Sequence, residues 1–377
     1  MSVWPANVTV EALEADAIAA TGLEDFGGTE YREGLSVLLG DYRRHAHFDA
    51  AGAAGARAML MGVLVQRLKA QHSLRQTRRA RIPVRRPWLI LSMPRSGTTA
   101  LHRLLAADPT AQGLEHWLGL FPQPRPPAAT WSAHPDFQAT AAALAGMRAA
   151  SPEIFALHAM TADEVDECRL LLMQSFANMS FFQNAVAPDY EAWHWQCDMR
   201  AAYARHRALL ELIDGGAGRR WVLKDPSHLM SLEALSREYP DMRVICTRRP
   251  AEVFLPSVAA LVLAARRLNE PEASPEEIGR LQLALWSRCA HELQEWRAAH
   301  PEIPWCDVDH EALRREPLAA IGAIYEAFGE PLGDEAAAAI RARAARLEAG
   351  ASTQQLTLED FGLSRRAVRI AFPEEFV

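Results

Sequence analysis

A strand, a tight loop and a helix follow one another in the stretch WLILSMPRSGTTALHRLLAADP, which runs from Trp88 to Pro109. The loop MPRSGTT, Met93–Thr99, joins the carboxyl end of the strand to the first turn of the helix. Backbone N–H groups and the positive end of the helix dipole can bind a phosphate at such a junction. Gly97 lets the chain approach closely, and Thr98 and Thr99 add hydroxyl donors. The stretch therefore predicts an α/β fold with an anion site at the end of a strand.

This loop differs from a Walker A loop at the positions that hold a triphosphate. A Walker A loop reads GxxxxGK[ST], with Lys on the terminal phosphates and Ser or Thr on magnesium. Here Arg95 occupies the loop, and Thr98 follows Gly97 where the Lys is required. We expect a ligand that carries a 5'-phosphate without a β/γ-phosphate chain. A P-loop kinase or NTPase stays as the alternative, because Asp225 at the end of a later strand offers a magnesium-binding acid.

Length and composition narrow the class of protein. The 377 residues, of which 49% are hydrophobic, suffice for one large α/β domain with appendages or for two domains. A net charge of -7 gives no overall attraction to nucleic acid or to anionic membranes. The five cysteines are scattered without metal-ligand spacing, and neither a basic signal peptide nor a long apolar run is present. We expect a soluble cytoplasmic protein that binds no metal and no nucleic acid and does not insert into a membrane.

The order of helical and extended patterns predicts the organisation of the chain. Apolar residues recur at helical spacing from Thr9 to about Leu74, which predicts an amino-terminal helical cap over residues 1–86. A main domain is expected over 87–377, with a helical insert at about 135–215. Further strands are predicted in RRWVLKDP, DMRVICTRRP and IPWCDVDH, with helices between them. The expected fold is α/β, a P-loop-type three-layer fold with a central parallel β-sheet flanked by helices.

The segment Arg67–Arg86 carries eight Lys or Arg residues and no Asp or Glu. Charge runs of this kind are usually solvated. We interpret the segment as a solvated helix face and connector, and the steering of anions toward a binding site is the alternative.

Two later segments match the loop in order and spacing. Lys224 ends a predicted strand in WVLKDPSHL, and Arg249 precedes Ser257 by eight residues in VICTRRPAEVFLPSV. Together with PRSGTT, this order resembles the sulfotransferase superfamily, which transfers a sulfuryl group from 3'-phosphoadenosine-5'-phosphosulfate (PAPS). The closest likeness is to a bacterial sulfotransferase family, through LKDPSHLMSLEALSREYPDMRVICTRRPAEVFLPS and LEDFGLSRRAV, and it runs from about Pro87 to Phe372.

The resemblance implies a binding map. It places the 5'-phosphosulfate on the loop, and it places the 3'-phosphate on Ser257 with Arg248 or Arg249. Lys224 would donate to the bridging oxygen, and no metal would be needed for the release of 3'-phosphoadenosine-5'-phosphate (PAP). Asp225 stands where the family usually has Ser, and RRP replaces RDP, so both arginines stay open. The implied loop residues are Arg95, Ser96, Gly97, Thr98 and Thr99.

The acceptor requires a general base, for which several residues compete. Glu115 lies twenty residues after Arg95, as does the base Glu in arginine-loop branches such as tyrosylprotein sulfotransferases. His228 is the rival, because small-molecule sulfotransferases use a His near their strand-end Lys. His116 and the acidic group of HAMTADEVDE, 158–167, are further candidates, although the latter fits a helix cap equally well.

The acceptor itself is expected to be a small molecule or a saccharide that offers a hydroxyl, or less often an amine. Its pocket would be walled by the helical insert and the Pro-rich loop, and four tryptophans are candidate wall residues that fit a core equally well: Trp117, Trp131, Trp193 and Trp195. A non-catalytic nucleotide-binding protein is a third hypothesis. A homodimer is left open by the Ala/Leu-rich cap.

Overall fold

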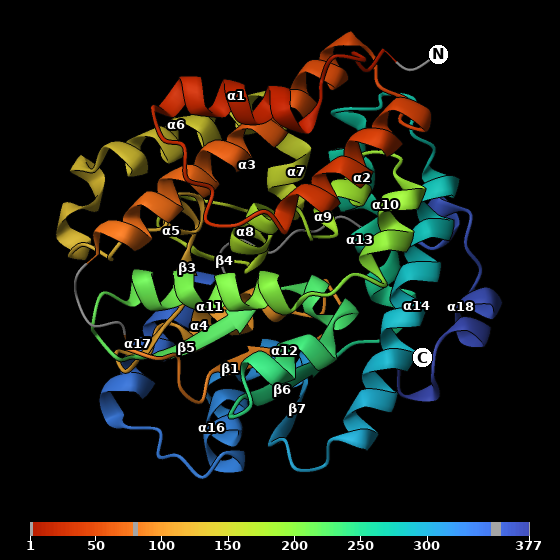
Figure 1. The fold of residues 1–377 in the computed structure, drawn as a ribbon. Coiled ribbons are helices and arrows are strands. Elements are labelled where there is room, and N and C mark those ends of the chain that lie inside the picture. The colour runs from red at the N-terminus through yellow and green to blue at the C-terminus, as the bar shows by residue number, and fades with distance from the viewer. Residues whose placement is uncertain (1–2, 78–81, 348–355, 377) are drawn as a thin grey trace.

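A parallel five-stranded sheet forms the centre of the computed structural model, which describes residues 3–77, 82–347 and 356–376 (Figure 1). The spatial order of the strands is β2-β5-β1-β6-β7, so β1 lies in the middle and pairs with β5 on one side and with β6 on the other. The strands are β1 (Trp88–Ile90), β2 (Ala111–Gln112), β5 (Arg220–Lys224), β6 (Arg243–Arg248) and β7 (Trp305–Asp309).

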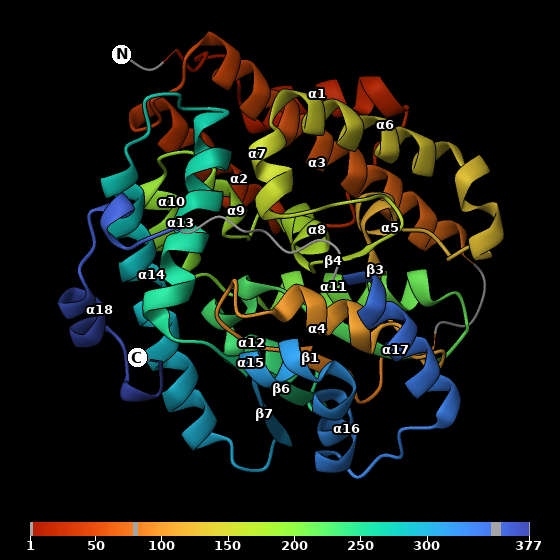
Figure 2. The same ribbon diagram turned by 180° about the vertical axis from the view of Figure 1, so that it is seen from behind.

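Helices cover both faces of this sheet, because its strands are apolar on both sides. In β1, the side chains of Trp88 and Ile90 pack into one core, and the side chain of Leu89 packs into the other. The first core is closed by α4 (Thr98–Leu105), α15 (His310–Arg315), α16 (Pro317–Ala327) and α17 (Asp334–Leu347). The second is closed by α11 (Arg200–Asp214), α12 (Leu232–Glu238) and α14 (Pro275–Ala299). Figure 1 shows α11 and α12 in front of the sheet. Figure 2, which gives the opposite view, shows α4 on the other face of the sheet. The predicted three-layer α/β fold is confirmed.

The predicted helix-rich regions form a layer beyond the carboxyl ends of the strands (Figure 2). The amino-terminal helices are α1 (Val10–Thr21), α2 (Tyr31–Arg44) and α3 (Ala50–Gln76). The segment before the predicted insert contributes α5 (His116–Leu120), and the insert contributes α6 (Pro135–Ala150), α7 (Pro152–Leu157), α8 (Arg169–Leu172), α9 (Ser180–Gln183) and α10 (Pro188–His194). A later segment adds α13 (Ala251–Arg267), whereas α18 (Arg365–Ala371) packs at the side against α13 and α14. Buried residues of α1–α3 belong to the same apolar core as those of α11 and α14, so the domain boundary at residue 86 stays a prediction.

Three details go beyond the pattern in the sequence. The edge strand β2 was not predicted, because two residues leave no periodicity to detect. The strands of RRWVLKDP and DMRVICTRRP are parallel, as expected, but β1 lies between them. The helical insert is interrupted by the short strand β4 (Val165–Asp166), which pairs antiparallel with β3 (Leu114–Glu115) from the segment before the insert. Through the described parts of the chain, we find no helix with the length and apolarity that a membrane span requires.

The first residue of the basic segment is structural, which corrects the expectation of a solvated face at that position. Arg67 is fully buried in α3, and its guanidinium donates to the carbonyls of Phe26 and Gln174 at 2.8 and 2.9 Å. It also pairs with Glu30 at 2.9 Å. A buried guanidinium that satisfies carbonyls of the cap and of the insert ties these parts together. Residues 78–81 of the segment lie outside the described residues.

Candidate functional site

The carboxyl ends of β1, β5, β6 and β7 meet at one edge of the sheet, as parallel strands must. Ile90 at the end of β1 is in register with Lys224 of β5 and with Ile245 of β6. A cavity of about 1110 Å³ opens above this edge, and loop residues Arg95 and Gly97 line it. Ligands of open α/β sheets bind in the crevice beyond the carboxyl ends of the strands, where connections diverge to the two sides. Here the divergence occurs at β1, so the loop lies at that crevice.

The loop is held in a left-handed conformation at two residues. Arg95 has a φ of 62° and Gly97 a φ of 85°. A Cβ atom at Gly97 would come within 2.8 Å of His310 Cδ2, so both the backbone and the space require glycine. Ser96 is fully buried, and its hydroxyl donates to the carbonyl of Met93 at 2.6 Å and lies 2.6 Å from Thr247 Oγ1. The Ser96 hydroxyl therefore supports the loop from below, whereas Gly97, Thr98 and Thr99 line the cavity.

Two arginines converge on the loop. Arg95 Nε donates to Ser257 Oγ at 2.9 Å, and Arg249 donates to the carbonyl of Arg95 at 2.5 Å. Burial and the nearby charge of Arg249 lower the pKa of Arg95. Within the described part of the chain, neither guanidinium has a carboxylate partner within ion-pair distance. Such a pair of cations favours an anion in the adjacent cavity.

Arg248 is held elsewhere, although it neighbours Arg249 in the sequence. Its guanidinium pairs with Asp307 of β7 at 2.9 Å and with Glu375 at 3.8 Å. Arg249 lines the cavity, and Arg248 is not among the described residues that do so. Of the two arginines that the sequence left open, the geometry therefore favours Arg249.

Lys224 lies at the end of β5 beside the loop, buried with Glu167. Its ammonium donates to Glu167 Oε1 at 2.6 Å and to Thr99 Oγ1 at 3.4 Å. The backbone N–H of Cys168 donates to the carbonyl of Lys224, which fixes the end of β4 against β5. Burial disfavours the charge of Glu167, but the positive charges around it, Lys224 foremost, outweigh that effect and lower its pKa. Lys224 and Glu167 thus form a largely buried ion pair next to Thr99 of the loop.

Asp225 follows Lys224 and lines the cavity. Its Oδ1 accepts from the backbone N–H of Ser227 at 2.8 Å, and its buried Oδ2 has no hydrogen-bond partner. Burial, together with the negative charge of Glu167, raises the pKa of Asp225 to about 7. The carboxyl group therefore carries less negative charge at neutral pH than an ordinary aspartate does.

Glu115, the first candidate for the base, points into a different environment. It is buried at the end of β3, where its carboxylate pairs with Arg125 of the Pro-rich loop at 2.5 Å. Burial raises the pKa of Glu115 against the opposing charge of Arg125. Glu115 is not among the described residues that line the cavity, so the structure does not bring it to Arg95. Its contacts fasten the Pro-rich loop to β3.

His228 is likewise directed into the core. It is fully buried, and its Nδ1 lies 2.9 Å from the hydroxyl of Tyr203. Burial lowers the pKa of His228 to about 3. His228 is not among the described residues that line the cavity. Tyr203 and His206 pack in the same buried cluster.

A different histidine faces the cavity with a carboxylate behind it. His116 lines the cavity, and its Nδ1 lies 2.5 Å from Asp166 Oδ2. Burial opposes the ionisation of Asp166, but the charge of Arg169 and the hydrogen bond from His116 hold its pKa well below the usual range. An ionised carboxylate only accepts, so Nδ1 of His116 donates to it, which in the neutral imidazole leaves the lone pair on Nε2. His158, the other cavity histidine beside Asp166, lies 4.0 Å away, and burial lowers its pKa.

Some cavity residues were not expected from the sequence. His310 and Arg314 reach the loop from the segment after β7, and Arg103 and Arg169 line the cavity from α4 and α8. The sequence could have indicated His310 and Arg314, because both follow a predicted strand, whose carboxyl end lies at the site. None of the four tryptophans proposed as wall residues is among the described residues that line the cavity, and Trp117 is fully buried against Trp131. A different tryptophan, Trp286, lines the cavity instead.

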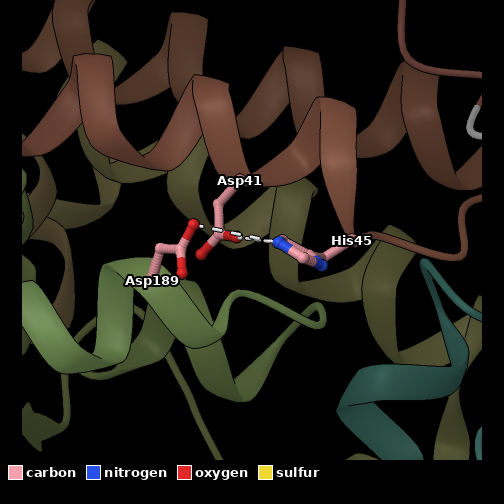
Figure 3. Close-up of side chains that lie close together, drawn as sticks. All are labelled: Asp41, His45 and Asp189. Atoms are coloured by element: carbon pink, nitrogen blue, oxygen red, sulfur yellow. Dashed lines mark ion pairs between the residues drawn. The ribbon is translucent and has the colours of Figure 1, made fainter.

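One group among the described residues brings three potential metal ligands together, Asp41, His45 and Asp189, with ligand atoms within 4.8 Å (Figure 3). Arg44 already pairs with Asp189 at 2.7 Å, and Asp41 accepts from the backbone N–H of Tyr190. The group joins α2 to α10, and its members are not among the described cavity residues. We interpret it as a contact between helices.

The raised pKa of Asp225 predicts a pH-dependent stability. The native carboxyl holds its proton up to about pH 7, and the unfolded one releases it near pH 4, so the stability that this group contributes is complete below pH 4 and is lost as the pH rises through 7. Asp225→Asn should therefore raise the free energy of unfolding at pH 8 by roughly 2–4 kcal/mol relative to the native chain. Urea unfolding between pH 4 and 8 measures this, with the exposed Asp163→Asn as the control. An equal pH dependence in all three proteins would contradict the assignment.

Comparisons with known proteins agree with this geometry. Residues 87–334 match the model of the Sulfotransferase family. The structure is similar to that of sulfotransferase STF1 from Mycobacterium tuberculosis H37Rv, at 37% identity and a TM-score of 0.87, over 97% of this chain and 98% of that chain. Sulfotransferase STF9 from Mycobacterium avium shares the fold, at 24% identity and a TM-score of 0.85, over 97% and 96%. A comparison with curated proteins found no match. The chain therefore belongs to the sulfotransferase family.

Proposed function

We propose that this chain transfers a sulfuryl group from PAPS to a hydroxyl, or an amine, of an acceptor held in the cavity, without a metal. The observation that carries the proposal is the convergence of Arg95 and Arg249 on a loop that opens into the cavity. Gly97 precedes α4 without a side-chain cap, so the first N–H groups of the helix are available to a phosphate. Two guanidinium groups and an uncapped helix suit a ligand with separate phosphates at its 5' and 3' positions.

The donor would lie with its 5'-phosphosulfate on Gly97, Thr98 and Thr99 and its 3'-phosphate near Arg249 and Ser257. The resemblance to sulfotransferases supports the position of the 5'-phosphosulfate on the loop. The choice of Arg249 is supported by its position at the cavity, whereas Arg248 is paired with Asp307. Lys224 lies 3.4 Å from Thr99 Oγ1, close enough to the loop to donate to the bridging oxygen. The ion pair with Glu167, at 2.6 Å, holds the ammonium at that position.

The step follows the in-line geometry of phosphoryl transfer. The acceptor oxygen forms a bond to sulfur while the bond from sulfur to the 5'-phosphate oxygen breaks. The electron pair of the broken bond stays on the phosphate oxygen, where Lys224 and Arg95 stabilise the added charge. The proton of the acceptor passes to the base, and PAP and a sulfate ester, or a sulfamate, result.

We assign the base to His116. Asp166 holds its Nδ1, and His116 lines the cavity, whereas Glu115 and His228 are paired within the protein and do not line it. A histidine that is oriented by a carboxylate through one ring nitrogen can accept a proton on the other.

The choice of arginine is tested by titration with PAP. Arg249→Ala should weaken PAP binding by roughly 10- to 100-fold, because a charge-assisted contact to a phosphate contributes about 1.5–3 kcal/mol. Arg248→Ala serves as the matched control and should change the affinity by less than about threefold, since Arg248 is paired with Asp307. Calorimetry gives both values. The assignment is wrong if Arg248→Ala is the more damaging substitution.

The base is tested by turnover. His116→Asn should lower kcat by roughly 10²- to 10⁴-fold and leave PAP affinity near that of the native chain. Glu115→Gln should keep most of the rate, because that carboxylate faces Arg125. Transfer of label from radioactive PAPS to the first acceptor that supports turnover measures both. A fully active His116→Asn protein together with an inactive Glu115→Gln protein would return the base to Glu115.

A further inference from the structure

The cavity is larger than one ligand requires. Pockets for a single small molecule usually measure about 300–1,000 Å³, and this one measures about 1110 Å³. The end formed by Pro94–Ala100, Arg249 and His310 belongs to the proposed donor site. Much of the remaining lining comes from α3, α6, α7, α13 and α14. We call this part of the cavity the acceptor chamber.

The walls of this acceptor chamber are apolar. Within the described part of the chain, α3, α6, α7, α13 and α14 contribute no Asp, Glu, Lys or Arg side chain to the lining. The residues that they contribute include Met59, Val63, Leu144, Ile154, Leu261 and Trp286. By contrast, the floor toward the donor carries His116, His158, Glu167 and Asp225. The ionisable side chains of the lining are thus absent from these five helices and lie toward the donor, where the transferred group must meet the acceptor.

Three of the polar residues that line the chamber, Thr140, Gln183 and Asn269, have partners in the protein. Thr140 donates to the carbonyl of Asp136, Gln183 accepts from Gln282, and the Asn269 amide donates to the carbonyl of Asn184. A saccharide buries many hydroxyls, and each one left without a partner costs free energy. An apolar molecule has no such requirement and gains from burial against these walls.

The mouth of the chamber is apolar as well. Met147 and Leu268 line it, and they are 43% and 48% exposed, which is unusual for large apolar side chains. Five of the lining residues are methionines, whose unbranched thioethers adapt to irregular shapes: Met59, Met147, Met160, Met173 and Met179. An acceptor with a long or bulky hydrocarbon part fits this rim.

We infer that the acceptor is a largely apolar alcohol, a lipid-like or polycyclic molecule with one hydroxyl, rather than a saccharide. Its hydroxyl meets His116 at the polar floor, and its hydrocarbon body fills the space between α3, α6, α7 and α13. This inference rests on the proposed function, because the chamber is assigned to the acceptor only if the loop holds the donor.

Gly62 of α3 provides a substitution that closes the chamber. It lines the cavity, and a Cβ atom there meets no other atom within 4 Å. Its φ is not in the left-handed range, so Gly62→Leu fills space without straining the helix. Gly146 of α6 is exposed and equally free of contacts, and it is not a described lining residue, so Gly146→Leu is the matched control.

The experiment titrates straight-chain alcohols from butanol to decanol, and maltose, into the full chain with and without PAP. The affinity should rise about threefold to fourfold per added methylene, which corresponds to about 0.8 kcal/mol. Gly62→Leu should weaken decanol binding at least tenfold, Gly146→Leu should change it less than twofold, and PAP binding should stay unchanged in both. Decanol, and not maltose, should then accept label from radioactive PAPS.

Other outcomes separate the two proposals. Binding or sulfation of maltose without decanol, an affinity independent of chain length, or equal effects of the two glycine substitutions would overturn the apolar acceptor. A failure of PAP to bind would instead overturn the proposed donor, whereas decanol titration of the nucleotide-free chain still reports on the chamber.

Discussion

Parallel pairing of β1 with both β5 and β6 is the constraint on which the site depends. Because the three strands run in the same direction and in register, the loop after β1, Lys224 at the end of β5 and Arg249 after β6 all emerge at one edge. The apolar residues that alternate along these strands fix the register from both faces. A one-residue shift in the register of β5 would point the Lys224 side chain to the opposite face of the sheet. The packing of the sheet therefore also fixes the position of the Lys224 ammonium.

The charges at this edge are arranged unequally. Lys224 is neutralised by Glu167, whereas Arg95 and Arg249 contact a hydroxyl and a carbonyl and keep their full charge toward the cavity. Asp225 also lines the cavity, and its burial beside Glu167 raises its pKa to about 7, so it carries less negative charge near pH 7 than an ordinary aspartate does. The site is thus prepared for an anion with several phosphate groups. The -7 net charge of the whole chain did not reveal this, because net charge says nothing of local arrangement.

The sequence predicted the layers, the main strands and the loop, because each has a local signature: alternating apolar runs, a turn rich in small residues and helical periodicity. The resemblance to sulfotransferases implied that Lys224 lies near the loop, and its ammonium lies 3.4 Å from Thr99 Oγ1. The sequence did not predict which side chains turn inward. Glu115 and Arg125 are ten residues apart with no pattern to show that they pair, and the Asp166 partner of His116 lies fifty residues away. Contacts of that kind arise from tertiary packing, so the choice of base and the apolar chamber required the structure.

The most direct test of the account is calorimetric titration of the native chain with PAP, with 5'-AMP, and with ATP and magnesium. The account predicts tight binding of PAP without a metal, and weaker binding of 5'-AMP by one to two orders of magnitude, because 5'-AMP lacks the 3'-phosphate that Arg249 would hold. Equal affinities for PAP and 5'-AMP would contradict the role given to Arg249 and Ser257. A preference for ATP with magnesium would contradict the central claim that this loop holds a 5'-phosphosulfate.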